Sequence, residues 1–370
     1  MIRRRLAALL WVVSVQIYSV CEAQESKAQR LDQQVQLAVA EHDFRGAVLV
    51  VHQGNVLLRK AYGLADLDSE RANSVDTPFL IGSLTKSFTA VLILRLAQDN
   101  RIDLHAPLLD YIPDLAPAIA EGLTLHYLLK HQTGLPSHLE RLVTFEDKGV
   151  SSQDILAIIN TATPDFAPGQ QYRYSNLNYH LAAIAAENVT GQDYVSLIAR
   201  YIAQPLGLTS TGVERHDSRL PLRANGYRSG WFGTRHDENI MSYALGSGDI
   251  YSTLDDLYRW EQALADEAFL SKASQQALFT PASAERGNYG YGFRIQPYQR
   301  GSEHPTPGTL TRHGGSMNGF LANLHRYTDD NLTVIVLANK RPFPIRDLTY
   351  RLKEIALDLP ATERKNAPME

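Results

Sequence analysis

The sequence is nearly free of cysteine, because Cys21 is the only one in 370 residues. A single thiol cannot form a disulfide within the chain, and it cannot build a zinc site from several thiolates. It also lies in an N-terminal segment that we expect to be removed, which excludes a thiol nucleophile from the processed chain. The fold must therefore be held by its core, and a chain of this length with 44% apolar residues can bury a large one.

A surplus of positive charge is also missing. The formal net charge is -4, and only 21% of the residues are charged. After the first five residues no block of Lys and Arg occurs, whereas nucleic-acid-binding proteins concentrate such residues. We therefore expect no nucleic-acid partner.

No apolar run is long enough to cross a bilayer comfortably, and the longest one follows the basic start MIRRR at residues 6–20. Small residues at Cys21 and Ala23 suit a signal-peptidase site, so we predict a signal peptide over residues 1–23. A membrane anchor and lipoprotein processing at Cys21 are the alternatives. Tyr18 and Val20 fit the lipoprotein site poorly. The sequence therefore predicts a secreted or periplasmic protein without a membrane span after cleavage.

Several common catalytic signatures are absent. The sequence holds no Gly-x-Ser-x-Gly elbow, no His-Glu-x-x-His metal motif, and no Gly-x-Gly-x-x-Gly after a strand. Its central histidines form no tight set of metal ligands, and we expect each to be structural: His126, His131, His138 and His180. We therefore predict neither a metal nor another cofactor.

The chain begins and ends with strand patterns. Residues 46–63 contain two β-branched apolar runs around Gln53-Gly54-Asn55, which indicates a hairpin. From Tyr289 onward three segments have a two-residue period, and Asp329-Asp330-Asn331 suits a turn between the last two. The closing segment, 345–359, has the spacing of a helix.

The middle of the chain is mainly helical. Apolar spacing predicts helices over 79–98, 123–136, 151–162 and 176–191, with Gly134 and Gly191 as stop signals. We therefore predict an α/β (α+β) fold, in which an antiparallel sheet is built from both chain ends and flanked by helices. The expected division is a sheet domain over 24–82 and 235–360, an inserted helical domain over 83–234, and a flexible tail over 361–370.

Three short patterns carry the chemistry. Ser83 and Lys86 lie three residues apart, so they share one face of a helix start. Alone, this pair is equally consistent with a solvated first turn. Tyr174-Ser175-Asn176 lies in a loop before a helix, and His313-Gly314-Gly315 lies in a predicted strand. Core packing would explain the tyrosine alone, and an N-cap would explain the asparagine.

Taken in order, Ser-x-x-Lys, Tyr-x-Asn and His-Gly-Gly resemble the motifs of the serine β-lactamase and penicillin-binding protein superfamily. The most similar branch holds class C β-lactamases, D-alanyl-D-alanine carboxypeptidases and related esterases. Flanking stretches also resemble that branch: LTLHYLLKHQTGLP, FAPGQQYRYSNLNYHLAA, QPLGLTST and GSGDIYSTLDDLYRW. The resemblance runs from about Phe44 to Leu357 and implies the β-lactamase/transpeptidase-like fold.

The residues permit a specific reaction. Ser83 needs a base within hydrogen-bond reach, and Lys86 can supply it if burial suppresses its charge. The resemblance implies that Tyr174 approaches Ser83 from across the cleft, and the three side chains are then one coupled titrating unit. It also implies that Asn176 holds Lys86 and the substrate amide, and that the backbone N–H groups of Ser83 and Ser316 bind the oxyanion.

His313 departs from the lysine that class C β-lactamases usually carry at this position. Histidine is largely neutral at pH 7, so it attracts a β-lactam carboxylate less strongly than lysine does. We expect Arg312 to point away from the cleft, because neighbouring residues on a strand face opposite sides. Gly314 and Gly315 are expected where a substrate lies close to the strand backbone.

The sequence therefore predicts an exported serine hydrolase that forms an acyl-enzyme at Ser83. Its expected substrates are D-amino-acid peptides, including peptidoglycan-derived ones, small esters or β-lactams. The alternatives are a class C type β-lactamase and a catalytically weak penicillin-binding-like protein that acts as a cell-wall binder. We expect a monomer.

Overall fold

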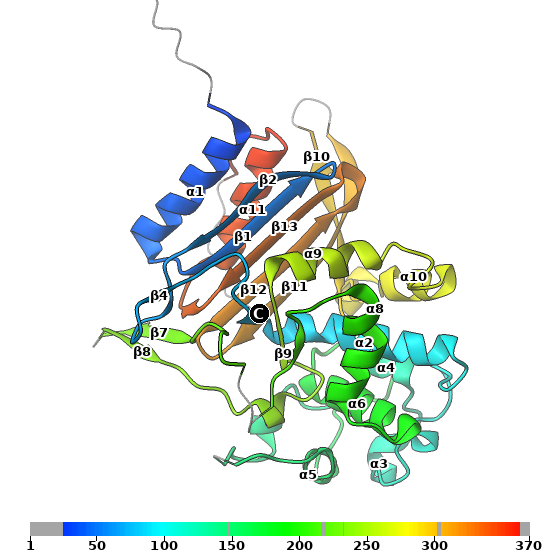
Figure 1. Ribbon diagram of the computed structural model, residues 1–370. Coiled ribbons are helices and arrows are strands. Elements are labelled where there is room, and N and C mark those ends of the chain that lie inside the picture. Colours follow the sequence, from blue (N-terminus) through cyan, green and yellow to red (C-terminus); the bar gives the residue numbers. More distant parts are fainter. Residues whose placement is uncertain (1–24, 147, 216–219, 232, 302–304, 363–370) are drawn as a thin grey trace, which may run out of the picture.

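The computed structural model describes residues 25–146, 148–215, 220–231, 233–301 and 305–362 (Figure 1). The predicted signal peptide and all but the first two residues of the predicted tail lie outside these ranges. Within them, no helix combines the length and the apolar character needed to cross a membrane.

A six-stranded antiparallel sheet forms the centre of the molecule, in the order β10-β11-β12-β13-β1-β2. Its strands are β1 (Gly46–His52), β2 (Asn55–Tyr62), β10 (Arg294–Arg300), β11 (Thr306–Met317), β12 (Phe320–Tyr327) and β13 (Leu332–Ala338). The two ends of the chain meet where β1 pairs with β13, with Leu49 opposite Ile335. The prediction of an antiparallel sheet built from both chain ends is confirmed.

The predicted turns lie where expected. In the β1–β2 hairpin, Gln53 and Gly54 adopt positive φ angles of 51° and 76°, which suits a tight turn between paired strands. Asn331 adopts φ 46° between β12 and β13. Asparagine tolerates this left-handed region better than most residues.

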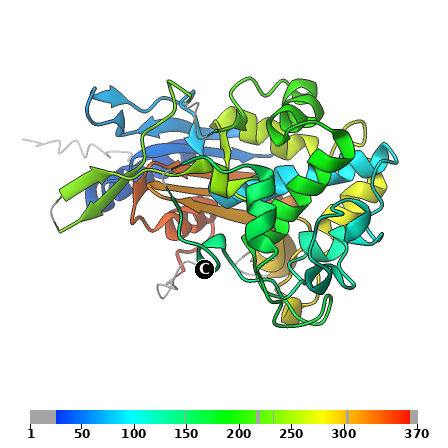
Figure 2. The same ribbon diagram turned by 90° about the horizontal axis from the view of Figure 1, so that it is seen from below.

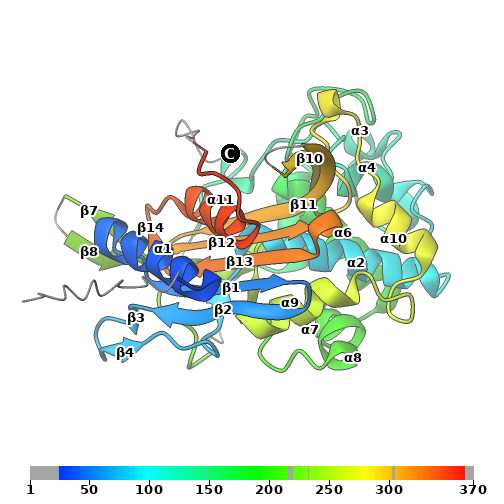
Figure 3. The ribbon, with the colours of Figure 1, turned by 90° about the horizontal axis from the view of Figure 1, so that it is seen from above.

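Helices cover both faces of the sheet, so its central strands are buried on both sides. Val48 and Val50 of β1 belong to the core beneath α1 (Lys27–His42) and α11 (Ile345–Ala356). Leu49 of the same strand belongs to the larger core on the opposite face. Figure 3 shows the α1–α11 pair lying over the sheet.

The opposite face carries the helical part of the chain (Figure 2). Its α-helices are α2 (Thr85–Gln98), α3 (Pro117–Ala120), α4 (Leu125–Leu129), α5 (Ser152–Ile159), α6 (Asn176–Thr190), α7 (Tyr194–Ile198), α8 (Gln204–Leu206), α9 (Leu254–Ala263) and α10 (Lys272–Phe279). Short 3-10 and π turns are η1 (Gly82–Leu84), η2 (Leu108–Asp110), η3 (Leu139–Arg141), η4 (Ala199–Ala203), η5 (Met241–Ala244), η6 (Ala284–Arg286) and η7 (Thr328–Asp330). As predicted, Ser151 caps α5 and Gly191 ends α6 in the left-handed conformation.

Two predicted helices are shorter than expected. Residues 79–98 do not form one helix, because Phe79–Leu80 is strand β5 and Gly82 adopts φ +51°, which an α-helix cannot contain. Similarly, α4 ends at Leu129 rather than at 136, because His131 adopts φ 56°. Both corrections concern segments that bend sharply next to the candidate site.

The segments that connect the larger elements form three small sheets, which the sequence analysis did not predict. Their strand orders are β14 (Lys340–Arg341)-β7 (Tyr227–Gly230)-β8 (Gly233–His236), β3 (Leu64–Asp66)-β4 (Arg71–Ala72), and β5 (Phe79–Leu80)-β9 (Ile250–Ser252)-β6 (Gly212–Val213). The pairing of β5 with β9 places Phe79 opposite Ser252 and Leu80 opposite Tyr251, shortly before Ser83 in the chain.

Candidate active site

Ser83 and Lys86 face each other at the junction of η1 and α2. The Nζ atom of Lys86 lies 2.9 Å from Oγ of Ser83 and 2.8 Å from the carbonyl oxygen of Ser247. Lys86 is fully buried, with 0% of its surface exposed. The predicted pair is therefore in direct contact, and it is not a solvated first turn.

Burial lowers the pKa of Lys86 well below its usual range, and the negative charge of Asp249 opposes this shift. Desolvation disfavours the ammonium form because the site offers it little water. A neutral amine within hydrogen-bond distance of Ser83 can accept the hydroxyl proton. The geometry and the direction of the pKa shift thus suit a general base.

Tyr174, just before α6, is the second side chain in contact with Ser83. Its side chain is hydrogen-bonded to Ser83, and its ring centroid lies 4.9 Å from Nζ of Lys86. Burial raises the pKa of Tyr174, and the hydrogen bond with Ser83 opposes the shift. The side chain is therefore a protonated phenol at neutral pH, and Ser83 lies between an amine and a proton donor.

Asn176 is the first residue of α6, and Ser175 occupies the N-cap position. The alternative interpretation of Asn176 as an N-cap is therefore wrong. Its Nδ2 atom lies 2.9 Å from Nδ1 of His138, and within the described ranges no hydrogen bond joins it to Lys86. The buried Oδ1 atom of Asn176 has no hydrogen-bond partner among the described residues.

The backbone of β11 touches η1 where two glycines meet. A Cβ atom on Gly315 would lie 1.8 Å from the carbonyl oxygen of Ile81 and 3.2 Å from the amide nitrogen of Ser83. A Cβ atom on Gly82 would lie 2.7 Å from the amide nitrogen of Ser316. The amides of Ser83 and Ser316 therefore lie along one backbone contact, as two oxyanion donors require.

The reason for Gly315 differs from the expected one, because the close approach is made by the protein's own backbone rather than by a substrate. Strand β11 nevertheless has an edge without a strand partner next to the site. Strand β10 pairs with β11 only as far as Arg312, opposite Arg294. The residues of β11 beyond Arg312 therefore have no strand partner on that side, while β12 pairs with them on the other.

His313 is held by two contacts of its own. Nδ1 lies 2.6 Å from the carbonyl oxygen of Gly314, and Nε2 lies 2.8 Å from the hydroxyl of Tyr289. A carbonyl only accepts, so Nδ1 carries the hydrogen and Nε2 accepts from Tyr289. Burial, followed by the charge of Lys86, lowers the pKa of His313 to about 3. The imidazole is thus neutral at pH 7.

Arg312 lies on the α11 side of the sheet. The charged and polar groups that influence it include Arg346 and Tyr350, both of which belong to α11. Since β11 alternates its side chains, Arg312 and His313 serve opposite faces. The prediction that Arg312 points away from the cleft agrees with this arrangement.

His131 was expected to be structural, and it is buried beside the site. Its ring centroid lies 4.3 Å from that of Tyr174. Its Nδ1 atom accepts from the backbone N–H of Ser175 at 3.2 Å and lies 3.1 Å from Nδ2 of Asn178. His131 thus supports the segment that carries Tyr174. No group of three His, Cys, Asp or Glu residues within the described ranges is arranged to hold a metal ion.

Sequence reasoning missed three contributors: the carbonyl of Ser247, the hydroxyl of Tyr289 and the carboxyl group of Asp249. A carbonyl contact leaves no sequence signal, because every residue has that group. Asp249 did leave one, since an acidic residue directly precedes the apolar strand β9. An acid in such a position is expected to be buried with a partner.

Comparison with known proteins places this geometry in a family. A family model described as Beta-lactamase matches residues 31–357. The chain belongs to the beta-lactamase family. Membership in this family makes it a serine hydrolase, and the predicted superfamily resemblance is confirmed.

Two relatives show the breadth of the beta-lactamase family. Penicillin-binding protein 4* of Bacillus subtilis (strain 168) is 29% identical over 328 residues, covering 81% of this chain and 69% of that protein. The D-aminopeptidase of Brucella anthropi is 28% identical over 330 residues, covering 86% of this chain and 60% of that protein. Both relatives are thus longer than the matched region.

Solved structures of other proteins share the fold. FmtA from Staphylococcus aureus superposes with a TM-score of 0.76 at 21% identity and covers 93% of each chain. The D-amino acid amidase from Ochrobactrum anthropi SV3 superposes with a TM-score of 0.74 at 24% identity, covering 89% of this chain and 99% of that one. The predicted fold class is confirmed.

Proposed function

We propose that this protein is an exported serine hydrolase that cleaves small acyl esters or amides of D-amino acids through an acyl-enzyme at Ser83. The observation that carries the proposal is the position of Ser83 between the buried amine of Lys86 and the phenol of Tyr174. A weak nucleophile between a base and a proton donor has what acyl transfer needs.

Acylation would begin with Lys86. Its neutral amine takes the proton of Ser83, while Oγ forms a bond to the substrate carbonyl carbon. The carbonyl oxygen would become an oxyanion bound by the amides of Ser83 and Ser316, and the close backbone contact of β11 with η1 supports this assignment. The transferred proton then resides on the Lys86 ammonium.

The leaving group would receive a proton through Tyr174. Because burial raises its pKa, the phenol remains protonated and can donate as the carbon–nitrogen or carbon–oxygen bond breaks. It regains a proton from the Lys86 ammonium, whose Nζ lies over its ring. In the second half of the reaction water attacks the acyl-enzyme, and Lys86 and Tyr174 again transfer the protons. Asn176 would accept a substrate N–H through its unpartnered Oδ1.

The surroundings of His313 support a preference for substrates without a carboxylate. Both imidazole nitrogens already have partners, and the low pKa keeps the ring neutral. A β-lactam carboxylate would therefore find no cation at position 313, so we expect slow turnover of penicillins. Two related proteins, a D-aminopeptidase and a D-amino acid amidase, support substrates derived from D-amino acids.

Export rests on the predicted signal peptide, and a relative that is a penicillin-binding protein supports action at the cell wall. The mature protein should then begin near Gln24. N-terminal sequencing of the processed protein, together with fractionation of the producing cells, tests this part. An unprocessed N-terminus in the cytoplasmic fraction would overturn it.

One labelling experiment tests the chemistry. The protein is treated with a fluorophosphonate probe or with a fluorescent penicillin, and the modified peptide is mapped by mass spectrometry. We expect both probes on Ser83 and neither on Ser83→Ala. A label elsewhere would contradict the nucleophile assignment. A stable penicillin adduct without ester or D-amide turnover would favour the penicillin-binding alternative, and rapid penicillin hydrolysis would favour the β-lactamase.

A further inference from the structure

A sharp turn over residues 245–249, here the lysine turn, connects the catalytic lysine with a buried carboxyl group. The carbonyl oxygen of Ser247 lies 2.8 Å from Nζ of Lys86. Two residues later, Asp249 is only 2% exposed, and both its carboxyl oxygens accept from the N–H of Gly246 at 3.1 Å. The lysine turn thus contributes the Ser247 carbonyl that contacts Lys86, and it ends at the buried carboxyl group of Asp249.

The lysine turn has little freedom to move. Gly246 adopts φ +63°, and a Cβ atom there would lie 2.7 Å from Cβ of Ala183 and 2.9 Å from the carbonyl oxygen of Tyr179, both on α6. The hydroxyl of Thr89 on α2 donates to the carbonyl oxygen of Gly246 at 2.6 Å. The carboxyl group of Asp249 is therefore held at a fixed place in the same turn whose Ser247 carbonyl contacts Lys86.

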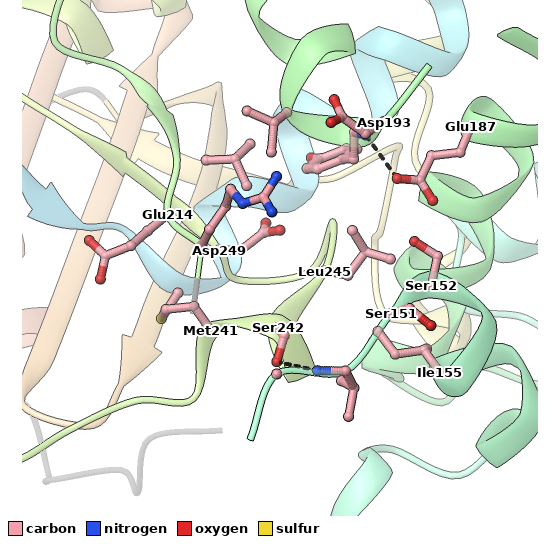
Figure 4. A pocket seen from close by; sticks show the side chains of 16 residues that line it. Ser151, Ser152, Ile155, Glu187, Asp193, Glu214, Met241, Ser242, Leu245 and Asp249 are labelled. Carbon is pink, nitrogen blue, oxygen red and sulfur yellow. Dashed lines mark hydrogen bonds between the residues drawn. The ribbon is translucent and has the colours of Figure 1, made fainter. Parts of the chain in front are cut away.

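A pocket of about 350 Å³ is lined by the first and the last residue of the lysine turn (Figure 4). Asp249 and Leu245 line it together with residues from the starts of α5 and α7 and from the end of α6. The charged or titratable residues of this pocket besides Asp249 are Glu187, Asp193, Tyr194, Glu214 and Arg215. Each of the three carboxyl groups has a partner of its own: Glu214 is paired with Arg223, Asp193 caps α7, and Glu187 accepts from the backbone N–H of Tyr194 at 2.8 Å.

On the catalytic side, the titratable groups that interact with Lys86 are Tyr174, Tyr179, His131, His138, His180 and His313. None of these six groups is an acid that is negative at neutral pH. Within the described ranges, Lys86 takes part in no salt bridge, and Asp249 is the carboxyl group whose charge acts on it.

We propose that Asp249 is a positioning residue for the reaction at Ser83, and that its carboxylate stabilises the ammonium that Lys86 becomes when it takes the Ser83 proton. This inference rests on the proposed acyl-enzyme function. No atom is transferred to Asp249: the proton moves from Oγ of Ser83 to Nζ of Lys86 and onward to the leaving group. The carboxylate stabilises the positive charge that develops on Lys86 in the transition state, and it does so without moving Lys86 or Ser83.

The ionisation of Asp249 sets when this help is present. Burial raises the pKa of Asp249 to about 8, with hydrogen bonds and the Lys86 charge opposing the shift. Below that pH the carboxyl group is neutral and adds little. Above it the carboxylate faces Lys86, so acylation should accelerate as pH rises through about 8. A nearby opposite charge changes an ionisation equilibrium by about 10- to 1000-fold, so we expect a rise at the lower end, roughly tenfold.

The test measures the rate of acylation by a neutral reporter ester from pH 5.5 to 9.5, by stopped flow, for the wild type, Asp249→Asn and Asp193→Asn. Asparagine keeps an oxygen that can accept from Gly246 but removes the charge. We expect the wild type and Asp193→Asn to show the rise near pH 8, and Asp249→Asn to match them below pH 7 and stay flat above. Asp193→Asn controls for loss of a carboxylate from the same pocket.

Two results would overturn the proposal: a rise near pH 8 that survives in Asp249→Asn, or an equal loss of rate at every pH, which indicates a purely structural role. If Asp249→Asn does not fold, a measurement on the wild type tests the proposal instead. The ¹³C resonances of its aspartate carboxyl groups must include one whose titration midpoint equals the midpoint of the rise in acylation rate. The Ser83→Ala variant distinguishes a failure of the Asp249 proposal from a failure of the proposed acyl-enzyme function. If it still acylates, the proposed function itself fails, whatever Asp249 does.

Discussion

Replacing Gly315 by alanine tests whether the contact of β11 with η1 assembles the oxyanion site. The new Cβ atom would lie 1.8 Å from the carbonyl oxygen of Ile81, where real Cβ atoms keep at least 3.0 Å. Both partners are backbone, so the two segments must separate by about 1 Å. This moves the Ser316 amide away from the Ser83 amide. Loss of one oxyanion donor costs about 10²–10³ in kcat, or roughly 3–4 kcal/mol.

The neighbouring glycine supplies the matched control. A Cβ atom on Gly314 would meet Oδ1 of Asn323 at 2.9 Å, which is a side-chain atom that can shift. We expect Gly314→Ala to retain kcat within about tenfold and Gly315→Ala to lose it with little change in KM, since the oxyanion forms only in the transition state. Steady-state ester hydrolysis measures both, and circular dichroism checks the fold. A folded Gly315→Ala with wild-type kcat would refute the assignment of these amides.

Three further predictions concern the site and its burial. Lys86→Ala and Tyr174→Phe should each slow acylation by at least about 10²-fold. The double variant should be little slower than the slower single variant, because the two groups act as a unit. Losses that multiply in the double variant, measured by stopped-flow acylation, would contradict this. His313→Lys should raise kcat/KM for carboxylate-bearing β-lactams and leave neutral esters nearly unchanged. Because burial and Lys86 also disfavour charge on a lysine there, the gain should shrink as pH rises above 7, and a gain independent of pH would contradict the electrostatic reason. Burial lowers the pKa of His126 and of His180 to about 4, so the native state binds fewer protons than the unfolded chain between about pH 6.5 and 4. The free energy of unfolding in urea should therefore fall as pH drops through that window, and a flat profile for the wild type would argue against buried neutral imidazoles.

The parts of the site that were predictable are those specified by local sequence. Ser83 and Lys86 are one helical turn apart, so their meeting follows from spacing alone. The tyrosine and the histidine required the family resemblance, because only the folded chain brings Tyr174 and His313 near Ser83. Likewise the hairpin at Gly54 was predictable from its turn residues, whereas the end of α4 was not, since it depends on the left-handed backbone of His131.

Tertiary contacts with the backbone were beyond sequence reasoning. The Ser247 carbonyl binds Lys86 from 161 positions away in the chain, and nothing about a serine side chain signals that role. The contact of Gly315 with Ile81 was not predicted, since the sequence does not show that Ile81 lies against it. The charge state of Lys86 depends on the same information, because burial is a property of the folded core.

The pairing of β1 with β13 has a consequence for how the protein reaches its active form. The sheet joins residues 46–52 to residues 332–338, so its centre cannot close until nearly the whole chain is available. Contacts so distant in sequence are slow to form because a long loop must be ordered first. The nucleophile and base are made early in synthesis, whereas the second oxyanion donor, Ser316, comes from near the end. Growing chains should therefore remain inactive until synthesis is nearly complete.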